Sequence, residues 1–253
     1  MIKETVLTLF FIGTCLAVPA DIGWRVVGGS NASTGQFPFI ISLRTITGSH
    51  TCGGSLIANN WVITAAHCVV GGYPAYYSVV AGINQLNSNS GVSAKVADII
   101  VHPNYNSNLI INDIALLRLS TPIQESSLIK IIQLEKNDND NVRDAVLIGW
   151  GRTSYPGNIP NDLQYLPTRT TTYASCKNSW PTETIVETEI CAFTQAGQGA
   201  CHGDSGGPLI SAESGQLIGL VSWGAPCALG APDVYTRVSS FIDWVKDNSG
   251  LDL

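Results

Sequence analysis

The stretch Trp61-Val62-Ile63-Thr64-Ala65-Ala66-His67-Cys68 decides the fold, because a short apolar run ends there in a histidine and a cysteine. Similar short runs recur along the chain between turn residues: Phe39 to Leu43, Ser78 to Ala81, Val96 to Val101, Ile114 to Leu119, Ala145 to Ile148 and Leu217 to Trp223. Runs of this length with β-branched residues, punctuated by 25 glycines and 12 prolines, are typical of a sandwich or barrel. We therefore predict a mostly β protein.

The main helical pattern lies at the end of the chain. Its apolar residues at helical spacing are Val238, Phe241, Ile242 and Val245. Ser239 and Ser240 are possible caps for this helix. Near the middle, the polar segment 135–141 (EKNDNDN) is expected to form a surface loop or a connection between two halves.

The length and composition of the chain limit the classes of function that it can have. The 253 residues are 45% hydrophobic and 13% charged, enough for one large or two small hydrophobic cores. The formal net charge is −6 and there is no run of basic residues. This charge pattern argues against a nucleic-acid partner.

The N-terminus resembles a targeting segment. A polar start precedes the apolar run from Val6 to Ala17, which is shorter than the roughly 20 residues that a membrane-spanning helix needs. Residues 1–17 are therefore predicted to be a secretory signal peptide, with cleavage after Ala20 as an alternative. A membrane anchor is the competing interpretation. We expect a secreted, extracellular protein with no membrane association.

Secretion decides how the cysteines are interpreted. Of seven cysteines, Cys15 lies in the predicted signal peptide and six remain. An even number in an oxidising compartment predicts disulfides, for which six cysteines allow 15 connectivities. Zinc is a weaker alternative because there are no CxxC pairs and the four histidines are scattered.

Three segments together predict nucleophilic catalysis. They are TAAHC around His67, NDIALL around Asp113 and GDSGGP around Ser205. A serine hydroxyl needs a base within hydrogen-bond reach, and imidazole can take up and return a proton near neutral pH. A carboxylate on the other ring nitrogen fixes the tautomer. Glycines beside a serine allow a sharp turn and leave N–H groups free for a developing oxyanion.

Because of these motifs, the chain from Arg25 to nearly its end resembles the chymotrypsin family of trypsin-like serine proteases. The matching motifs are RVVGGS, TAAHC, DIALL, GWG at 149–151, GDSGGP and VSWG at 221–224. The resemblance implies two six-stranded antiparallel β-barrels with a C-terminal α-helix and an active site between them. His67 would be the general base, Asp113 its orienting partner and Ser205 the nucleophile, with Gly203 and Ser205 forming the oxyanion hole.

The same resemblance implies the covalent organisation. The expected disulfides are Cys52–Cys68, Cys176–Cys191 and Cys201–Cys227. Residues 18–25 would be an activation propeptide and 26–253 the protease domain, with barrel one at about 26–130 and barrel two at about 135–240. Cleavage after Arg25 would free the α-amine of Val26 to pair with Asp204. The alternative is that Asp204 only caps its turn.

The specificity pocket departs from the trypsin pattern. The position where trypsin-like members carry an aspartate is Gly199 here, and the opposite wall is expected to include Ser222, Trp223 and Gly224. Asp233 stands where most members have glycine, a combination that resembles broad-specificity serine collagenases of crustaceans and insects. Its carboxylate would either accept basic side chains or turn away and leave a chymotrypsin-like pocket. Elastase-like and trypsin-like specificities are further alternatives.

We expect no cofactor. We also expect no metal, because the calcium loop that the resemblance to trypsin implies uses acidic residues and 69–91 contains none. Expected partners are protein or peptide substrates, an activating trypsin-like protease and protein inhibitors, and we expect a monomer. Asn31 begins a glycosylation motif. His50 and His102 are interpreted as structural, and His202 as a residue near the pocket mouth. The alternative from another class is a catalytically silent homologue that acts as a binding module.

Overall fold

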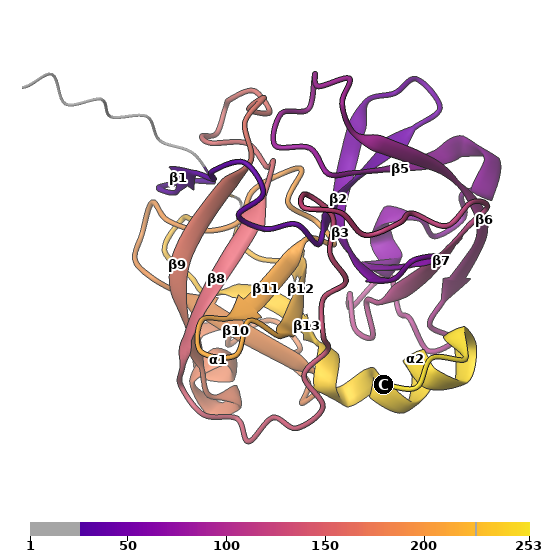
Figure 1. Cartoon of the computed structure of the whole chain (residues 1–253). Coiled ribbons are helices and arrows are strands. Elements are labelled where there is room, and N and C mark those ends of the chain that lie inside the picture. The colour runs from indigo at the N-terminus through magenta and orange to yellow at the C-terminus, as the bar shows by residue number, and fades with distance from the viewer. Residues whose placement is uncertain (1–25, 226) are drawn as a thin grey trace, which may run out of the picture.

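The computed structural model describes residues 26–225 and 227–253, which form two β-barrels side by side (Figure 1). The predicted signal peptide, the propeptide and Arg25 lie outside the described residues. No helix in those two described ranges is long and apolar enough to cross a membrane.

The first barrel closes in the order β2-β3-β4-β7-β6-β5. Its strands are β2 (Ile40–Thr45), β3 (His50–Ala58), β4 (Trp61–Thr64), β5 (Tyr77–Ala81), β6 (Val92–Val101) and β7 (Ala115–Leu119). Short 3-10 turns, η1 (Ala66–Cys68) and η2 (Pro74–Tyr76), follow β4 and precede β5. All pairings are antiparallel.

The second barrel closes because β8 pairs with both β11 and β9. Its strands are β8 (Asp144–Gly149), β9 (Gln164–Thr171), β10 (Glu189–Phe193), β11 (Pro208–Ser211), β12 (Leu217–Trp223) and β13 (Asp233–Arg237). A short strand, β1 (Ser30–Asn31), adds to β9. The segment that starts at residue 26 therefore joins the second barrel, although the sequence analysis assigns 26–130 to the first. The two barrels confirm the predicted fold.

The α-helices in the described part of the chain are α1 (Tyr173–Ser179) and α2 (Ile242–Ser249), which follows the turn η3 (Val238–Phe241). Ser239 and Ser240 lie inside η3, and neither η3 nor α2 has a side-chain cap, so the proposed serine caps are wrong. The aromatic rings of Phe241 and Trp244 pack on His102, which follows β6 of the first barrel.

Apolar residues pack in three main clusters. Leu43, Val62 and Leu117 lie inside the first barrel, and Leu147 and Tyr235 inside the second. A third cluster joins outward-facing residues of both barrels to η3 and α2; it includes Ile63, Trp150, Leu220 and Val245. Because the barrels pack on each other, strands such as β4 are buried on both faces, which explains their continuous apolar runs. The segment 135–141 connects the barrels without regular structure.

Candidate active site

His67 and Asp113 meet at one edge of the first barrel. The antiparallel pairing of Thr64 with Ala115 places the end of β4 beside the start of β7. His67 follows β4 and Asp113 precedes β7, so both project at the same edge. Asp113 Oδ2 lies 2.7 Å from His67 Nδ1, and Oδ1 accepts a 2.8 Å hydrogen bond from the His67 backbone N–H.

The second barrel holds Asp113 from the other side. Ser222 Oγ donates to Asp113 Oδ2 at 2.6 Å, and Thr236 Oγ1 donates to the Asp113 carbonyl oxygen at 2.6 Å. A register shift in the β12–β13 pairing between Val221 and Trp223 accompanies this placement of Ser222. Asp113 is only 1% exposed, whereas the His67 side chain is 27% exposed. The imidazole therefore connects a buried carboxylate to the surface.

The turn that carries Ser205 lies against the first barrel. Gly53 N–H donates to the Ser205 carbonyl at 2.8 Å, and Thr64 Oγ1 donates to the Gly53 carbonyl at 2.8 Å. Gly206 has φ +70°, and an added Cβ would stand 2.9 Å from the Ala65 backbone nitrogen. Only glycine fits this approach without strain. Ser205 is thus fixed close to the segment that carries His67.

Two backbone donors lie at this turn. Gly203 has φ +103°, a conformation that favours glycine. Within the described part of the chain, the N–H groups of Gly203 and Ser205 donate to no acceptor, and the Ser205 hydroxyl makes no hydrogen bond. These N–H groups are therefore available to an oxygen that carries negative charge.

A pocket of about 200 Å³ opens beside Ser205. Its described lining includes four residues singled out from the sequence: Ser222, Trp223, Gly224 and Asp233. His202 also lines it, and its ring lies 5.9 Å from that of Tyr155. Gly199 does not contribute to the lining; it lies behind the Asp233 carboxylate instead.

The Asp233 side chain turns toward the pocket. Its Oδ2 accepts a 2.7 Å hydrogen bond from Ala200 N–H and would stand 2.5 Å from a Cβ added to Gly199. Its Oδ1 would stand 2.9 Å from a Cβ added to Gly224. Burial raises the pKa of Asp233 to about 7, although the Ala200 bond opposes this shift, and the charge of Asp204 adds to it. The carboxyl thus occupies the space that a side chain at position 199 would need.

Comparison with known proteins decides the family. The family model described as Trypsin matches residues 26–245. The chain belongs to the trypsin family of serine proteases. It is 43% identical to chymotrypsin-2 of Vespa crabro over 88% of this chain and 99% of the relative. It is 38% identical to putative trypsin-6 of Homo sapiens over 95% and 96% of the two chains, and 37% identical to trypsin-1 of Astacus astacus over 88% and 100%.

Membership makes the protein a serine endopeptidase with protein substrates. The disulfides among the described residues are Cys52–Cys68, Cys176–Cys191 and Cys201–Cys227, as the resemblance implies. The first lies beside His67, where Cys52, His67 and Cys68 are the one candidate metal-ligand group among the described residues. Because both sulfurs are in a disulfide, they offer no thiolate to a metal.

Asp204 is the most buried carboxyl near the serine protease site. It is fully buried and accepts hydrogen bonds from Gly151 N–H at 2.7 Å and Cys201 N–H at 3.0 Å. Burial raises its pKa to about 7, against the effect of these two bonds. No cation pairs with it among residues 26–225 and 227–253. Val26 is also fully buried, in the cluster inside the second barrel.

His50 is a site residue that the sequence analysis misses. Its Nε2 lies 3.0 Å from the Gly203 carbonyl oxygen, and its Nδ1 lies 2.9 Å from Ser42 Oγ. Because a carbonyl only accepts, Nε2 carries the hydrogen. Burial lowers the pKa of His50, and the nearby Arg44 lowers it further, against the effect of the Gly203 bond. A neutral His50 thus fixes the carbonyl of Gly203, the residue whose own N–H is the candidate oxyanion donor. Its position two residues before Cys52 is the only sequence signal.

Asn31 lies on the exposed strand β1, and its Oδ1 accepts a 2.8 Å hydrogen bond from Gln164 Nε2. Glycosylation at Asn31 stays a prediction.

Proposed function

We propose that this protease is secreted as a zymogen and cleaves peptide bonds with Ser205 as nucleophile, His67 as base and Asp113 as its partner. The observation that carries the proposal is the arrangement at one edge of the first barrel. There the buried Asp113 carboxylate contacts His67 Nδ1, and the turn that carries Ser205 lies against the same barrel. An ionised carboxylate only accepts, so Nδ1 carries the hydrogen and Nε2 is left as the proton acceptor. Asp113 therefore sets the tautomer that a general base needs.

The proton moves in two steps. His67 Nε2 takes the Ser205 hydroxyl proton as Oγ bonds to the substrate carbonyl carbon, and the carbonyl oxygen becomes an anion. The N–H groups of Gly203 and Ser205 stabilise that anion. The imidazolium then gives its proton to the leaving amine as the C–N bond breaks. Water repeats the sequence on the acyl-enzyme and releases Ser205.

Cleavage after Arg25 activates the enzyme in this proposal. The new Val26 ammonium would neutralise Asp204, a buried carboxylate that has no cationic partner among the described residues. A buried ion pair that exists only after cleavage provides a switch. The activating enzyme cuts after arginine and is thus trypsin-like.

The substrate preference proposed here is broad. Asp233 supports acceptance of lysine and arginine side chains, because its carboxyl lies in the pocket lining rather than turning away. The remaining lining near it, Ala200, Val221 and Gly224, is small or apolar and suits aromatic and leucine side chains. The likeness to both a wasp chymotrypsin and several trypsins is consistent with this mixed preference.

A peptide library, with each residue type placed before the scissile bond, tests function and preference together. We expect the trypsin-activated enzyme to cleave after phenylalanine, leucine, lysine and arginine, and Ser205→Ala to cleave nothing. Asp233→Asn keeps the side-chain size but removes the charge, and it should lose cleavage after lysine and arginine selectively. An equal loss for all residues would exclude the proposed role of Asp233, and an inactive wild-type protein would indicate a silent homologue.

A further inference from the structure

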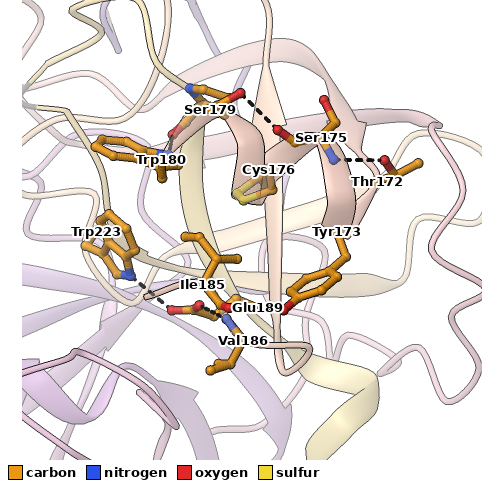
Figure 2. Close-up of a disulfide and its surroundings, with 12 residues drawn as sticks. Thr172, Tyr173, Ser175, Cys176, Ser179, Trp180, Ile185, Val186, Glu189 and Trp223 are labelled. Carbon is orange, nitrogen blue, oxygen red and sulfur yellow. Dashed lines mark hydrogen bonds between the residues drawn. A yellow bond between two sulfur atoms is a disulfide. The ribbon is translucent and has the colours of Figure 1, made fainter. Parts of the chain in front are cut away.

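Two tryptophans pack on each other beside the catalytic pocket, and one of them, Trp223, lines it. Trp223, the last residue of β12, lines the pocket and is half-buried. Its ring packs edge-on against Trp180 with centroids 5.0 Å apart, and Trp180 directly follows α1 (Figure 2). Trp180 Nε1 donates to the Pro232 carbonyl at 3.1 Å. The second ring is therefore held in place by the segment that precedes β13.

The carboxylate of Glu189 holds the first ring. Glu189 Oε1 accepts a 3.0 Å hydrogen bond from Trp223 Nε1, and Oε2 accepts a 2.9 Å bond from Val186 N–H (Figure 2). The residue opens β10 and is 3% exposed. The disulfide Cys176–Cys191 joins β10 to α1, so the strand that carries Glu189 and the helix that Trp180 follows are covalently linked.

This carboxylate is buried, and no cation among the described residues pairs with it. Arg237 bonds the Glu189 carbonyl oxygen and pairs its charge with Asp138 and Asp140. Burial raises the pKa of Glu189, although its two hydrogen bonds oppose this shift, and the charge of Asp113 adds to it. Burying an unpaired carboxylate costs free energy. A role in fixing the indole accounts for an acid at this position better than core packing does.

We propose that Glu189 is a positioning residue of the substrate site, which fixes the indole of Trp223 for binding of the peptide that precedes the scissile bond. The inference rests on the proposed function. The end of β12 from Ser222 to Gly224 would pair with an extended substrate, and Trp223 lies in the middle of that segment. A fixed ring is ready to receive the substrate without loss of side-chain entropy on binding.

The substitution Glu189→Gln tests the role with little change in shape. Two N–H donors converge on the Glu189 oxygens, and an amide offers one oxygen and a donor in place of the second. Either the indole or Val186 then loses its partner. Loss of one hydrogen bond to a charged group is expected to cost about tenfold in binding.

The measurement compares two substrates with the same residue before the scissile bond, a tetrapeptide amide and a single-residue ester. Glu189→Gln should lower kcat/KM for the tetrapeptide about tenfold, mainly through KM, and change the ester less than about twofold. Glu135→Gln is the matched control, because Glu135 is a buried acid in the segment before β8 that pairs with Arg143 and does not line the pocket. The control should change both substrates equally.

A double-mutant cycle makes the assignment specific. In the Trp223→Phe background the donor is gone, so Glu189→Gln should cause no further loss on the tetrapeptide. Equal losses on both substrates, or additive losses in the cycle, would refute the positioning role. If Glu189→Gln does not fold, Glu189→Asp carries the same test, since its shorter carboxylate cannot reach both donors. A wild-type protein that cleaves neither substrate would refute the proposed function itself, and with it this inference.

Discussion

At the scale of single residues, the carboxyl of Asp233 sets the character of the pocket. It is 6% exposed, bonds one wall through Ala200 N–H and lies close to Gly224 on the other. Since burial raises its pKa to about 7, it is neutral in weak acid and ionised in weak base. The neutral form suits apolar substrates and the ionised form suits cationic ones.

The preference between substrates should therefore depend on pH. The ratio of kcat/KM for a lysine substrate to that for a phenylalanine substrate should rise about tenfold from pH 6 to pH 8, because kcat/KM reports the free enzyme's ionisation. The ratio cancels any effect of pH on the catalytic steps that both substrates share. Parallel assays of Asp233→Asn are the control, in which the ratio should be flat. A flat ratio in the wild type would contradict the assignment.

His50 acts at the same scale but through another residue. Its Nε2–H bonds the Gly203 carbonyl, and the Gly203 N–H is the proposed oxyanion donor. His50→Ala should lower kcat about tenfold with little change in KM, because the oxyanion exists only in the transition state. Steady-state kinetics on one peptide amide measure both constants. A rise in KM with kcat intact would instead place His50 in substrate binding.

At the scale of elements, the turn from Gly203 to Pro208 depends on its contact with β3 and β4. Gly206→Ala should be damaging, because its Cβ would collide with Thr64 Oγ1 and its φ is positive. We expect a loss of about 1–3 kcal/mol in the free energy of unfolding. Denaturant unfolding of the inactive Ser205→Ala background avoids self-digestion. Gly215→Ala is the comparison, because Gly215 also has φ +70° but has open space around an added Cβ. It should lower the free energy of unfolding by less than Gly206→Ala does.

The elements also show what can be predicted from sequence. The strands are predictable because short β-branched runs between glycines and prolines have few other folds available. The start of the last helix is not predictable in the same way: Ser239 and Ser240 resemble caps in the sequence, but the chain enters α2 through a 3-10 turn that contains both. His50 and Glu189 escape prediction for a different reason. Their partners, Gly203 and Trp223, are distant in sequence and meet them only in the folded chain.

At the scale of the whole molecule, the two barrels share a buried apolar interface, and the proposed switch lies inside the second one. In the proposed switch, Asp204 would gain its countercharge when Val26 becomes a new N-terminus. The uncleaved protein should therefore be less stable where Asp204 is ionised. Burial raises the pKa of Asp204 to about 7 in the folded protein, from the ordinary value of 3.8. Between these two pH values, the folded state therefore binds more protons than the unfolded state. Stability from this group is present at low pH and is lost as pH rises through about 7.

Thermal unfolding of the Arg25→Gln protein at pH 5 and pH 8 tests this linkage. The Tm should fall between these values by more in Arg25→Gln than in Arg25→Gln with Asp204→Asn, since the amide does not titrate. The difference between the two proteins removes the parallel contribution of Asp233, whose pKa is raised in the same way. Identical pH dependence in both would contradict the buried, unpaired state of Asp204.

The central claim is that Ser205 becomes a nucleophile through His67 once the chain is cut after Arg25. A fluorophosphonate probe, with the modified residue located by mass spectrometry, tests it most directly. We predict stoichiometric labelling at Ser205 in the trypsin-treated protein, at least about 100-fold slower labelling in His67→Ala, and almost none in Arg25→Gln treated in the same way. Labelling that is equally fast in all three proteins, or that occurs at another residue, would contradict the account.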